Sequence, residues 1–186
     1  MSDSVLLQTE RFVLTTLDES WADELLDYQM RNREFWREWN PLTPDDFYTV
    51  ATQRARLRAD AELLRQGLGL RLYVLRKAAE QGPIVADFAF NNIVRGAFQS
   101  CYLGYKTDAG AINQGVMTEA LRAGIAYAFE EMKLHRIEAN VMPHNARSRR
   151  VVSKLGFAEE GLARQYLKIH GVWEDHIHYV LLNDAV

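Results

Sequence analysis

Two strand-to-helix turns hold the residues of this chain whose types and spacing could do chemistry. The first turn, at residues 111–117, places Asn113 and Gly115 just before an apolar-periodic segment. Unpaired backbone N–H groups at the start of a helix bind anions, glycine lets the backbone approach a pyrophosphate, and asparagine tolerates a left-handed conformation. The spacing is therefore typical of a phosphate site, although turns with one glycine are also common where no ligand binds.

The second turn, at residues 142–150, leads into a helix that carries Arg147, Arg149 and Arg150 near its start. Basic side chains at a helix N-terminus oppose the helix dipole, and an anion nearby would offset this repulsion. The alternative is that these side chains point into solvent, at a cost of a few tenths of a kcal/mol, as is ordinary for a surface. Asn145 has a structural explanation as the helix N-cap.

Four residues are candidates for the proton acceptor of a catalysed reaction. His144 would titrate near neutral pH, while Glu138, Tyr102 and Tyr105 lie on predicted strands. Each of them also has a packing or solvent-facing interpretation, so the sequence does not select one. Cys101, the single cysteine, has no activating neighbour and is typical of buried packing rather than of an acyl-enzyme nucleophile.

Three further histidines lie close together near the end of the chain, at His170, His176 and His178. The last two would share one face of a strand, whereas Asp175 would lie on the opposite face. Because no second pair of ligands with zinc spacing accompanies them, we expect packing and hydrogen bonding there and no metal site.

Composition limits the classes of protein to consider. The chain has 186 residues, of which 48% are hydrophobic, so we expect one domain that spans residues 1–186. The formal charge of -3 gives no field that would attract a nucleic acid, and the single cysteine excludes an intrachain disulfide. No apolar run approaches the roughly 20 residues of a membrane span, and the start lacks the features of a signal peptide. We therefore expect a cytoplasmic protein with no nucleic-acid or membrane partner.

Periodicity and capping residues predict the elements that must position these side chains. Helices are expected at 19–30, at 44–67 with Thr43 as N-cap, at 117–132 and at 146–155. Strands are expected at 11–17, 70–76, 84–94, 98–105, 136–142, 164–169 and 172–182, with turns at 81–83 and 170–171. This order predicts a mixed α/β fold in which helices cover the faces of a sheet. Between the first two helices, Phe35, Trp36 and Trp39 either plug the core or line a substrate groove.

The two turns and their flanking strands resemble the RimJ/RimL branch of the GNAT N-acetyltransferases. Residues 135–148 read His-Arg-Ile-Glu-Ala-Asn-Val-Met-Pro-His-Asn-x-Arg-Ser, and residues 154–161 read Lys-Leu-Gly-Phe-x-x-Glu-Gly. Asn-Ile-Val-Arg-Gly-Ala-Phe at 92–98, Cys-Tyr-Leu-Gly-Tyr at 101–105 and Gly-x-Trp-x-Asp-His at 171–176 are similar to the RimJ-type enzymes, which acetylate a ribosomal-protein alanine. The similarity covers nearly the whole chain.

The resemblance implies a GNAT fold with a mixed, mostly antiparallel sheet of seven strands and about four helices. The sheet would be splayed between its fourth strand, at 97–107, and its fifth, at 136–142, with acetyl-CoA in the opening. The pantetheine arm would pair with the fourth strand as an added strand. The implied cofactor-binding residues are Leu103, Gly104, Tyr105, Asn113, Gln114, Gly115, Val116, Met117, Thr118, Asn140, Asn145, Ser148 and Arg150.

The phosphate loop departs from the pattern of the family. That pattern has Gln or Arg where this chain has Ile112, and a glycine where it has Asn113. We expect weakened rather than abolished binding of acetyl-CoA, because the main donors are backbone N–H groups.

The expected reaction is acetyl transfer from acetyl-CoA to an amine by direct attack. An α-amino group has an ordinary pKa near 7.7–8.0 against about 10.4 for lysine, so lysine needs roughly 3.5 kcal/mol more to lose its proton. We therefore favour the N-terminus of a protein, with a ribosomal protein as one candidate and a monomer or homodimer as the enzyme. The alternatives are a small amine such as an antibiotic or polyamine, and a non-catalytic acyl-CoA-binding module. The candidate catalytic residues are Ser148, Tyr102 and His144, and the candidate substrate-binding residues are Phe35, Trp36, Trp39 and Tyr166.

Overall fold

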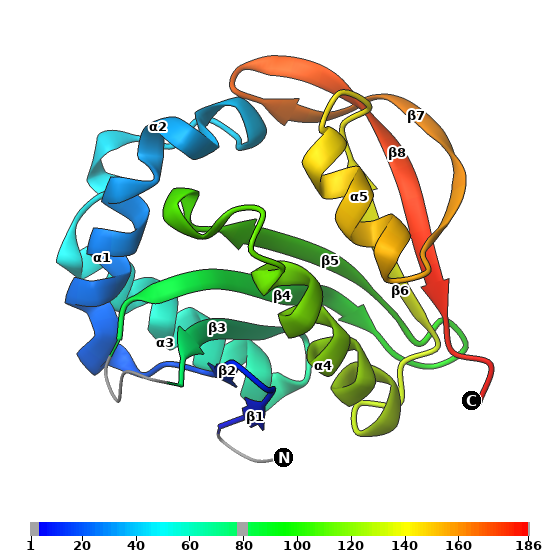
Figure 1. The fold of residues 1–186 in the computed structure, drawn as a ribbon, viewed down its shortest axis with the longest axis horizontal. Coiled ribbons are helices and arrows are strands. Elements are labelled where there is room, and N and C mark those ends of the chain that lie inside the picture. Colours follow the sequence, from blue (N-terminus) through cyan, green and yellow to red (C-terminus); the bar gives the residue numbers. More distant parts are fainter. Residues whose placement is uncertain (1–3, 78–81, 186) are drawn as a thin grey trace.

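An eight-stranded sheet with the order β1-β2-β3-β4-β5-β6-β8-β7 runs through the computed structural model, which describes residues 4–77 and 82–185 (Figure 1). The strands are β1 (Leu6–Gln8), β2 (Phe12–Thr15), β3 (Leu70–Arg76), β4 (Ile84–Val94), β5 (Ser100–Thr107), β6 (Arg136–Val141), β7 (Ala158–Ile169) and β8 (Val172–Leu182). The mixed, mostly antiparallel sheet is confirmed. The predicted number of seven strands is too low by one, because the three residues of β1 are too few for alternation to reveal a strand.

One pair of neighbouring strands, β5 and β6, is parallel and joined over only part of its length. The register runs from Ser100 opposite Arg136 to Tyr102 opposite Glu138 and ends there. Beyond that point β5 continues to Thr107 paired only with β4, while β6 continues paired only with β8. The two strands therefore diverge in space, as Figure 1 shows. This confirms the splayed sheet at the predicted pair of strands, which become fifth and sixth once β1 is counted.

Helices cover both faces of the sheet. The α-helices are α1 (Ala22–Arg31), α2 (Arg33–Trp36), α3 (Val50–Gln66), α4 (Val116–Glu130) and α5 (Ala146–Lys154). Short 3-10 helices are η1 (Glu19–Trp21), η2 (Arg37–Trp39), η3 (Asp45–Phe47) and η4 (Ala109–Ala111). The aromatic connection between the first two predicted helices is thus itself helical, as α2 and η2.

The start of α3 corrects one sequence prediction. Thr43 is not an N-cap, because its hydroxyl donates to the carbonyl of Pro41 and the following residues form η3. The helix begins six residues later than Pro44 would suggest, at Val50, where the hydroxyl of the N-cap Thr49 accepts from the backbone N–H of Thr52. The predicted end at Gly67 is confirmed by a left-handed φ of 70°.

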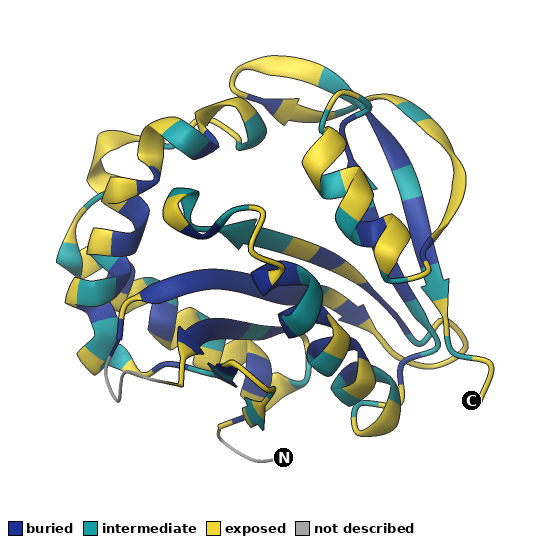
Figure 2. Cartoon of the chain, viewed as in Figure 1, coloured by how far each residue is buried: buried dark blue, intermediate teal, exposed yellow. Residues whose placement is uncertain are grey.

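Two hydrophobic clusters lie on opposite faces of the sheet. On the face covered by α4 and α5, hereafter the α4/α5 side, Phe88 packs so closely that a Cβ at Gly124 would lie 2.5 Å from its ring. On the other face, covered by α1 and α3 and hereafter the α1/α3 side, Tyr28 and Trp36 pack with α3 residue Leu57. β4 is buried along most of its length between the two clusters, whereas β7 is mostly exposed (Figure 2).

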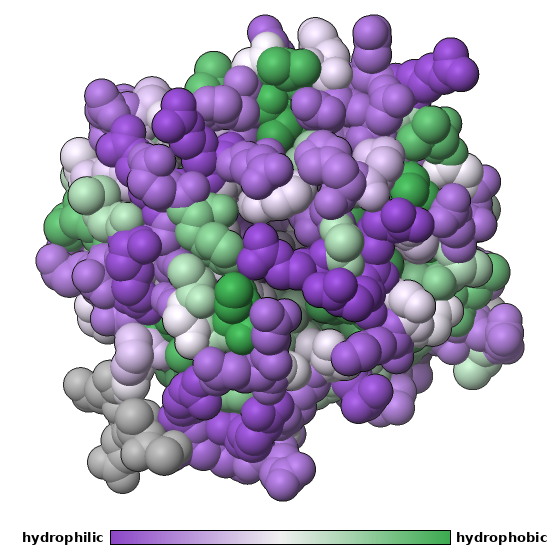
Figure 3. Space-filling view, turned by 45° about the horizontal axis from the view of Figure 1, so that its top comes forward, coloured by the Kyte–Doolittle hydropathy of each residue, from purple (hydrophilic) through white to green (hydrophobic). Residues whose placement is uncertain are grey.

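The last two strands form the predicted hairpin, but β7 begins at Ala158, six residues before the predicted start at residue 164. His170 and Gly171 both have positive φ, at 44° and 87°, which matches the tight turn expected there. Gln81 of the other predicted turn lies outside the described residues. Within the described ranges no helix is long and apolar enough to cross a membrane. The face drawn in Figure 3 is mostly hydrophilic, with hydrophobic side chains in small patches.

Candidate active site

A cavity of about 600 Å³ lies where β5 and β6 diverge. Its wall is built by the far half of β5, the end of β6, the start of α4, helix α5, the α2–η2 segment and part of the β7–β8 hairpin. Because β6 leaves β5 after Tyr102, the edge of β5 that would have faced β6 lacks a strand partner. An extended ligand segment can bind that edge in the manner of an added strand. The space over the sheet at Gly104 is open, since a Cβ there would meet only the side-chain amide of Asn91, at 3.7 Å.

One end of the cavity is formed by the turn before α4. Asn113 and Gly115 both adopt left-handed backbone conformations, with φ of 59° and 75°. Gly115 is the N-cap residue and provides no side-chain cap, so the first N–H groups of α4 keep their capacity to donate. Val116, Met117 and Thr118 lie on the cavity wall. This end therefore has the backbone donors and the helix polarity that suit an anionic group.

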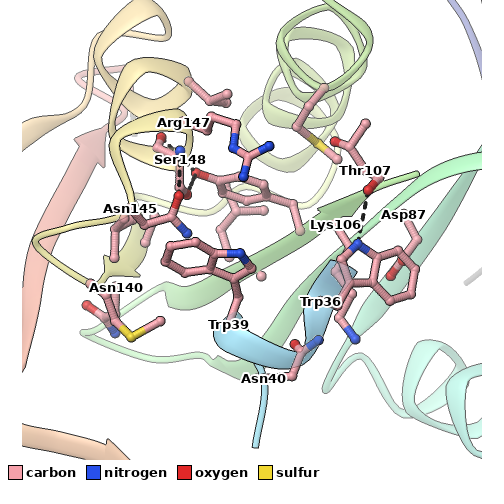
Figure 4. A pocket seen from close by; sticks show the side chains of 18 of the residues that line it. Trp36, Trp39, Asn40, Asp87, Lys106, Thr107, Asn140, Asn145, Arg147 and Ser148 are labelled. Atoms are coloured by element: carbon pink, nitrogen blue, oxygen red, sulfur yellow. Dashed lines mark hydrogen bonds between the residues drawn. The ribbon is translucent and has the colours of Figure 1, made fainter. Parts of the chain in front are cut away.

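Two hydroxyl groups meet on the α4/α5 side of the cavity, that of Ser148 at the start of α5 and that of Tyr105 on β5. The side-chain oxygens of Ser148 and Tyr105 lie 2.5 Å apart, and the Tyr105 hydroxyl is 3.2 Å from the Ser148 carbonyl (Figure 4). Burial raises the pKa of Tyr105 to about 12, so its phenol stays protonated at neutral pH. Asn145 caps the helix by accepting from the backbone N–H of Ser148 at 3.1 Å. The pair can supply a proton at the serine hydroxyl.

A polar side chain with one unpaired oxygen lines the opening from β6. Asn140 donates through Nδ2 to the Tyr166 hydroxyl at 3.2 Å, but its buried Oδ1 has no hydrogen-bond partner among the described residues. A buried amide oxygen left without a donor is costly, and a ligand N–H in the cavity would satisfy it. This orphaned acceptor fits a ligand that carries amide groups.

The three aromatic residues of the α2–η2 segment lie on the wall in different ways. Figure 4 shows two of them, Trp36 and Trp39. Trp36 is 6% exposed, packs edge-on against Tyr28 and donates to the carbonyl of Thr107 at 3.0 Å, so it serves the core as well as the wall. Trp39 lies with its ring 5.4 Å from that of His144, and Phe35 lies 5.1 Å from the guanidinium of Arg147. Trp36 therefore belongs to the core as well as to the wall, and the predicted role of these residues in binding substrate stays a prediction.

Basic side chains predominate on the wall. Among the described residues they are Arg56, Arg71, Lys106, Arg147, Arg150, Lys154 and Lys168, against the single carboxylate of Asp87. That carboxylate is bound by Arg71 at 2.6 Å and accepts from the Tyr28 hydroxyl at 3.1 Å, so its charge is compensated. The cavity consequently favours anionic or neutral ligands over polycations.

Lys106 lies between this cavity and a second one of about 490 Å³. Its ammonium is 5.1 Å from the ring of Trp36, and burial lowers its pKa. Lys106, Arg56, Trp36, Asn40 and Pro41 line both cavities, which therefore adjoin one another on the α1/α3 side. A ligand longer than the first cavity can extend into the second past these cations.

The wall includes most of the residues that the sequence singled out. These are Phe35, Trp36, Trp39, Leu103, Gly104, Tyr105, Asn113, Gly115, Val116, Met117, Thr118, Asn140, Asn145, Ser148 and Arg150. The wall does not include Tyr102, His144, Gln114 and Tyr166. The roles predicted for these four residues stay predictions.

These four residues have contacts or exposure that account for their absence from the cavity wall. The Gln114 carbonyl accepts from Arg11 and its side-chain oxygen accepts from Arg76, so both groups point away from the cavity. Tyr166 contacts Asn140, and His144 contacts Trp39. Tyr102 is 40% exposed at the point where the strands part.

Lys106 and His176 are among the wall residues that the sequence did not assign to the site. Lys106 follows the quoted Cys-Tyr-Leu-Gly-Tyr run, and its strand period places it on the same face as Gly104. His176 belongs to the three histidines for which the sequence predicted packing. Alternation along the strand predicted that it shares a face with His178, but did not show which elements lie against that face.

The other side chains that the sequence considered for chemistry are buried or hydrogen-bonded to neighbouring residues. Cys101 is buried on β5, and burial raises the pKa of its thiol to about 12. His178 Nδ1 lies 3.2 Å from Glu138 Oε1, and His170 Nε2 accepts a hydrogen bond from Arg37 Nε at 3.1 Å. Among the described residues, no three His, Cys, Asp or Glu side chains are grouped closely enough to hold a metal ion.

Comparison with known proteins gives one consistent result. Residues 11–158 match the model of the acetyltransferase (GNAT) domain. The probable N-acetyltransferase YjcK of Bacillus subtilis is 39% identical over 178 residues, which cover 96% of this chain and 97% of that protein. The ribosomal protein uS5-alanine N-acetyltransferase of Escherichia coli is 38% identical, over 93% of this chain and 88% of its own.

Solved structures give the same result. A ribosomal-protein-S5-alanine acetyltransferase from Vibrio fischeri superposes with a TM-score of 0.92 at 32% identity, over 97% of this chain and 98% of its own. Mycobacterium smegmatis RimJ, solved in complex with CoA-disulfide, has a TM-score of 0.87 at 26% identity, over 94% of this chain and 83% of its own.

Proposed function

The chain belongs to the GNAT acetyltransferase family, and on that premise we propose that it acetylates the N-terminal α-amino group of a protein. It is an acyltransferase, and acetyl-CoA is the proposed acetyl donor. The observation that carries the proposal is the opening between β5 and β6, with the free edge of β5 leading to the start of α4. The names of the Escherichia coli and Vibrio fischeri relatives make a ribosomal protein the first candidate substrate.

The α4/α5 side has the groups that a CoA thioester needs. The edge of β5 around Leu103 to Tyr105 would pair with the amides of pantetheine, and from the α1/α3 side the unpaired Asn140 Oδ1 would accept from one of them. The left-handed turn at Asn113 and Gly115 would present backbone N–H groups to the pyrophosphate. When bound, acetyl-CoA supplies the activated acetyl group, and its departing sulfur needs a proton.

Ser148 is the residue that we propose to supply this proton. Its hydroxyl lies on the cavity wall, and the protonated phenol of Tyr105 lies within hydrogen-bond distance behind it. The serine can therefore donate outward while the tyrosine restores its hydrogen bond. Cys101 is unsuited to an acyl-enzyme step, because burial raises the pKa of its thiol to about 12. Both observations support direct attack by the amine in a ternary complex.

The charge of the α1/α3 side supports a peptide over a polyamine as the acceptor. Lys106 and Arg56 line the passage between the two cavities, and the carboxylate of Asp87 is already bound by Arg71. A polycationic amine would meet like charges in this passage, which costs binding energy. A peptide N-terminus brings a single charge on its amine, and the rest of its chain can follow into the second cavity.

Mass spectrometry of protein N-termini tests the proposal directly. Cells with and without this protein are compared, and we expect N-terminal acetyl groups to disappear from one or a few proteins. Purified protein is then assayed on the corresponding N-terminal peptide and on spermidine. Turnover of spermidine with an unchanged set of N-termini would support the small-amine alternative. Binding of acetyl-CoA without turnover of any amine would indicate a non-catalytic module. Since acetyl-CoA and ribosomes share the cytoplasm, we propose that location.

A further inference from the structure

His176 is a buried titratable residue on the cavity wall, with no role in the proposed function so far. It is 3% exposed and lies on β8, next to Ile177, which packs in the cluster on the α4/α5 side. Alternation along the strand therefore turns His176 to the α1/α3 side, together with His178. His178 lies opposite Asn140 in the register of β6 and β8, so His176 lies two residues farther into the opening.

The hydrogen bond of the His176 ring determines which nitrogen carries the proton. Nδ1 lies 3.0 Å from the backbone carbonyl oxygen of Glu174. A carbonyl oxygen only accepts, so Nδ1 must carry the hydrogen in the neutral ring, and Nε2 is left with a free lone pair. The ring is also held against Tyr166, at 5.7 Å between centroids. A fixed ring with a free basic nitrogen on a cavity wall can take a proton from a ligand.

We propose that His176 is the general base of this enzyme, and that its Nε2 takes the proton from the ammonium form of the acceptor. This inference rests on the proposed function and names a residue of the same site. The base acts from the α1/α3 side, while Ser148 and Tyr105 act from the α4/α5 side. The proton is thus removed from the acceptor on one side of the sheet, and a proton is donated to the sulfur from the other side. Each transfer uses its own residues.

The protons balance as follows. The ammonium group of the acceptor gives one proton to Nε2 of His176, which later releases it to solvent. The neutral nitrogen forms a bond to the acetyl carbon, the carbon–sulfur bond breaks, and the sulfur keeps the electron pair. The sulfur takes a proton from the Ser148 hydroxyl, and the second proton lost by the nitrogen passes to the serine oxygen, which restores the hydroxyl. The net products are an N-acetyl amide, CoA with a free thiol and one proton.

The other candidate bases have worse positions. Glu138 is buried, binds Arg136 at 3.0 Å and His178 at 3.2 Å, and does not lie on the cavity wall. His144 is exposed beside Trp39 outside the wall, and Tyr102 is exposed where the strands part. Tyr105 is a proton donor at neutral pH, because its pKa is raised.

The surroundings keep His176 in its neutral form at neutral pH. Burial lowers its pKa below the ordinary value, and the charge of His178 acts in the same direction. On its own strand, the Glu174 backbone hydrogen bond and the carboxylates of Glu174 and Asp175 act in the opposite direction but more weakly than burial. Tyr166 is the titratable neighbour on β7, and burial raises its pKa, so it contributes no charge.

Nuclear magnetic resonance of the imidazole nitrogens tests the tautomer without any assay. Protein labelled with ¹⁵N-histidine is titrated from pH 5 to pH 8, free and with CoA. We expect His176 to carry its hydrogen on Nδ1 at pH 7 and to titrate below the ordinary histidine value. A ring that carries its hydrogen on Nε2, or that is charged at pH 7, would overturn the proposal whatever the enzyme acetylates.

The variant His176→Asn tests the role in catalysis, since its amide can still donate to the Glu174 carbonyl. With the peptide substrate we expect turnover at pH 7 to fall about 100-fold, within the range of general-base effects. At pH 9.5 an α-amine is already neutral, so the loss should shrink to less than about fivefold. His178→Asn, two residues along the same face, is the matched control and should change turnover less than threefold.

The outcomes separate this proposal from the proposed function. A loss in His176→Asn that stays constant from pH 6 to pH 9.5 would indicate a structural role and overturn the assignment. Equal losses in the two variants would do the same. If the wild-type protein acetylates spermidine and no peptide, the proposed acceptor is wrong, but the pH-dependent loss in His176→Asn would still support His176 as the base.

Discussion

The two sides of the sheet offer different kinds of groups at the opening between β5 and β6. On the α4/α5 side the groups are mostly main-chain ones: the free edge of β5, the turn before α4, and one serine hydroxyl. On the α1/α3 side they are side chains from distant parts of the chain, including Trp39, Lys106 and His176. A main-chain site tolerates substitution of its side chains, whereas a side-chain site depends on each of them. We therefore expect the first side to be shared widely within the family and the second to set the acceptor.

Ser148→Ala should give the largest effect on the α4/α5 side, because Ser148 is the one side chain there with a chemical role. We expect turnover to fall about 100-fold, within the range for loss of a general acid. The affinity for acetyl-CoA should change less than threefold, since the backbone N–H of Ser148 still donates to Asn145. Steady-state kinetics and calorimetry measure the two quantities.

Ser153→Ala is the control for that experiment, on the same helix and exposed to solvent. It should leave both quantities unchanged. Turnover of Ser148→Ala equal to that of the wild type would remove this residue from the mechanism, and the α4/α5 side would then act through main-chain groups alone.

Gly115→Ala tests the main-chain part of the same side. The φ of 75° at Gly115 is unfavourable for alanine by roughly 1–2 kcal/mol, and relief of this strain would turn the N–H groups away from the ligand. We expect the affinity for CoA to fall about tenfold, measured by calorimetry, with turnover at saturation nearly unchanged. Gly96→Ala is the matched control, because Gly96 has a φ of 71° and no atom within 4 Å of its Cβ position. Equal losses of CoA affinity in both variants would mean that the effect is general destabilisation.

Tyr105→Phe should have a smaller effect that does not depend on pH. The phenol supports the Ser148 hydroxyl but transfers no proton to the substrate, so we expect turnover to fall three- to tenfold. The raised pKa of about 12 means that Tyr105 keeps its proton at every pH below about 11. The ratio of wild-type to variant turnover should therefore be constant from pH 6 to pH 9.5, in contrast to the shrinking loss expected for His176→Asn. A ratio that changes with pH in this range would mean that Tyr105 gains and loses its proton during the reaction, which contradicts the supporting role given to it.

The sequence predicted the α4/α5 side better than the α1/α3 side, for a physical reason. The turn at residues 111–117 and the cap at Asn145 are local, because backbone conformation and helix starts depend on neighbouring residues. Asn113 and Gly115 could therefore be interpreted directly as left-handed positions. The weaker binding predicted from Ile112 and Asn113 stays a prediction, although the left-handed φ of Asn113 shows that asparagine supplies the conformation required there.

The α1/α3 side depends on contacts between residues far apart in the sequence, which local patterns do not contain. The sequence located Trp36 and Trp39 but could not decide between core and groove, since that depends on Tyr28 and Thr107. It interpreted His176 as a packing residue, because the sequence did not show that this face of the strand lines a cavity. The start of α3 was predicted wrongly because Thr43 and Thr49 are both suitable N-cap residues. The sequence did not show that the residues between them form the short helix η3.

Lys106→Met should give the smallest effect and the most specific one, because Lys106 acts on the acceptor and not on the transferred acetyl group. For a peptide with glutamate among the residues after its N-terminus, we expect KM to rise about fivefold, or about 1 kcal/mol. The matched peptide with glutamine should change less than twofold, and turnover of spermidine should increase as repulsion is removed. Lys154→Met, on the wall of the α4/α5 side, is the control and should alter CoA affinity but not peptide KM. If both lysine variants change the same parameter, the two sides do not divide cofactor and acceptor between them as we propose.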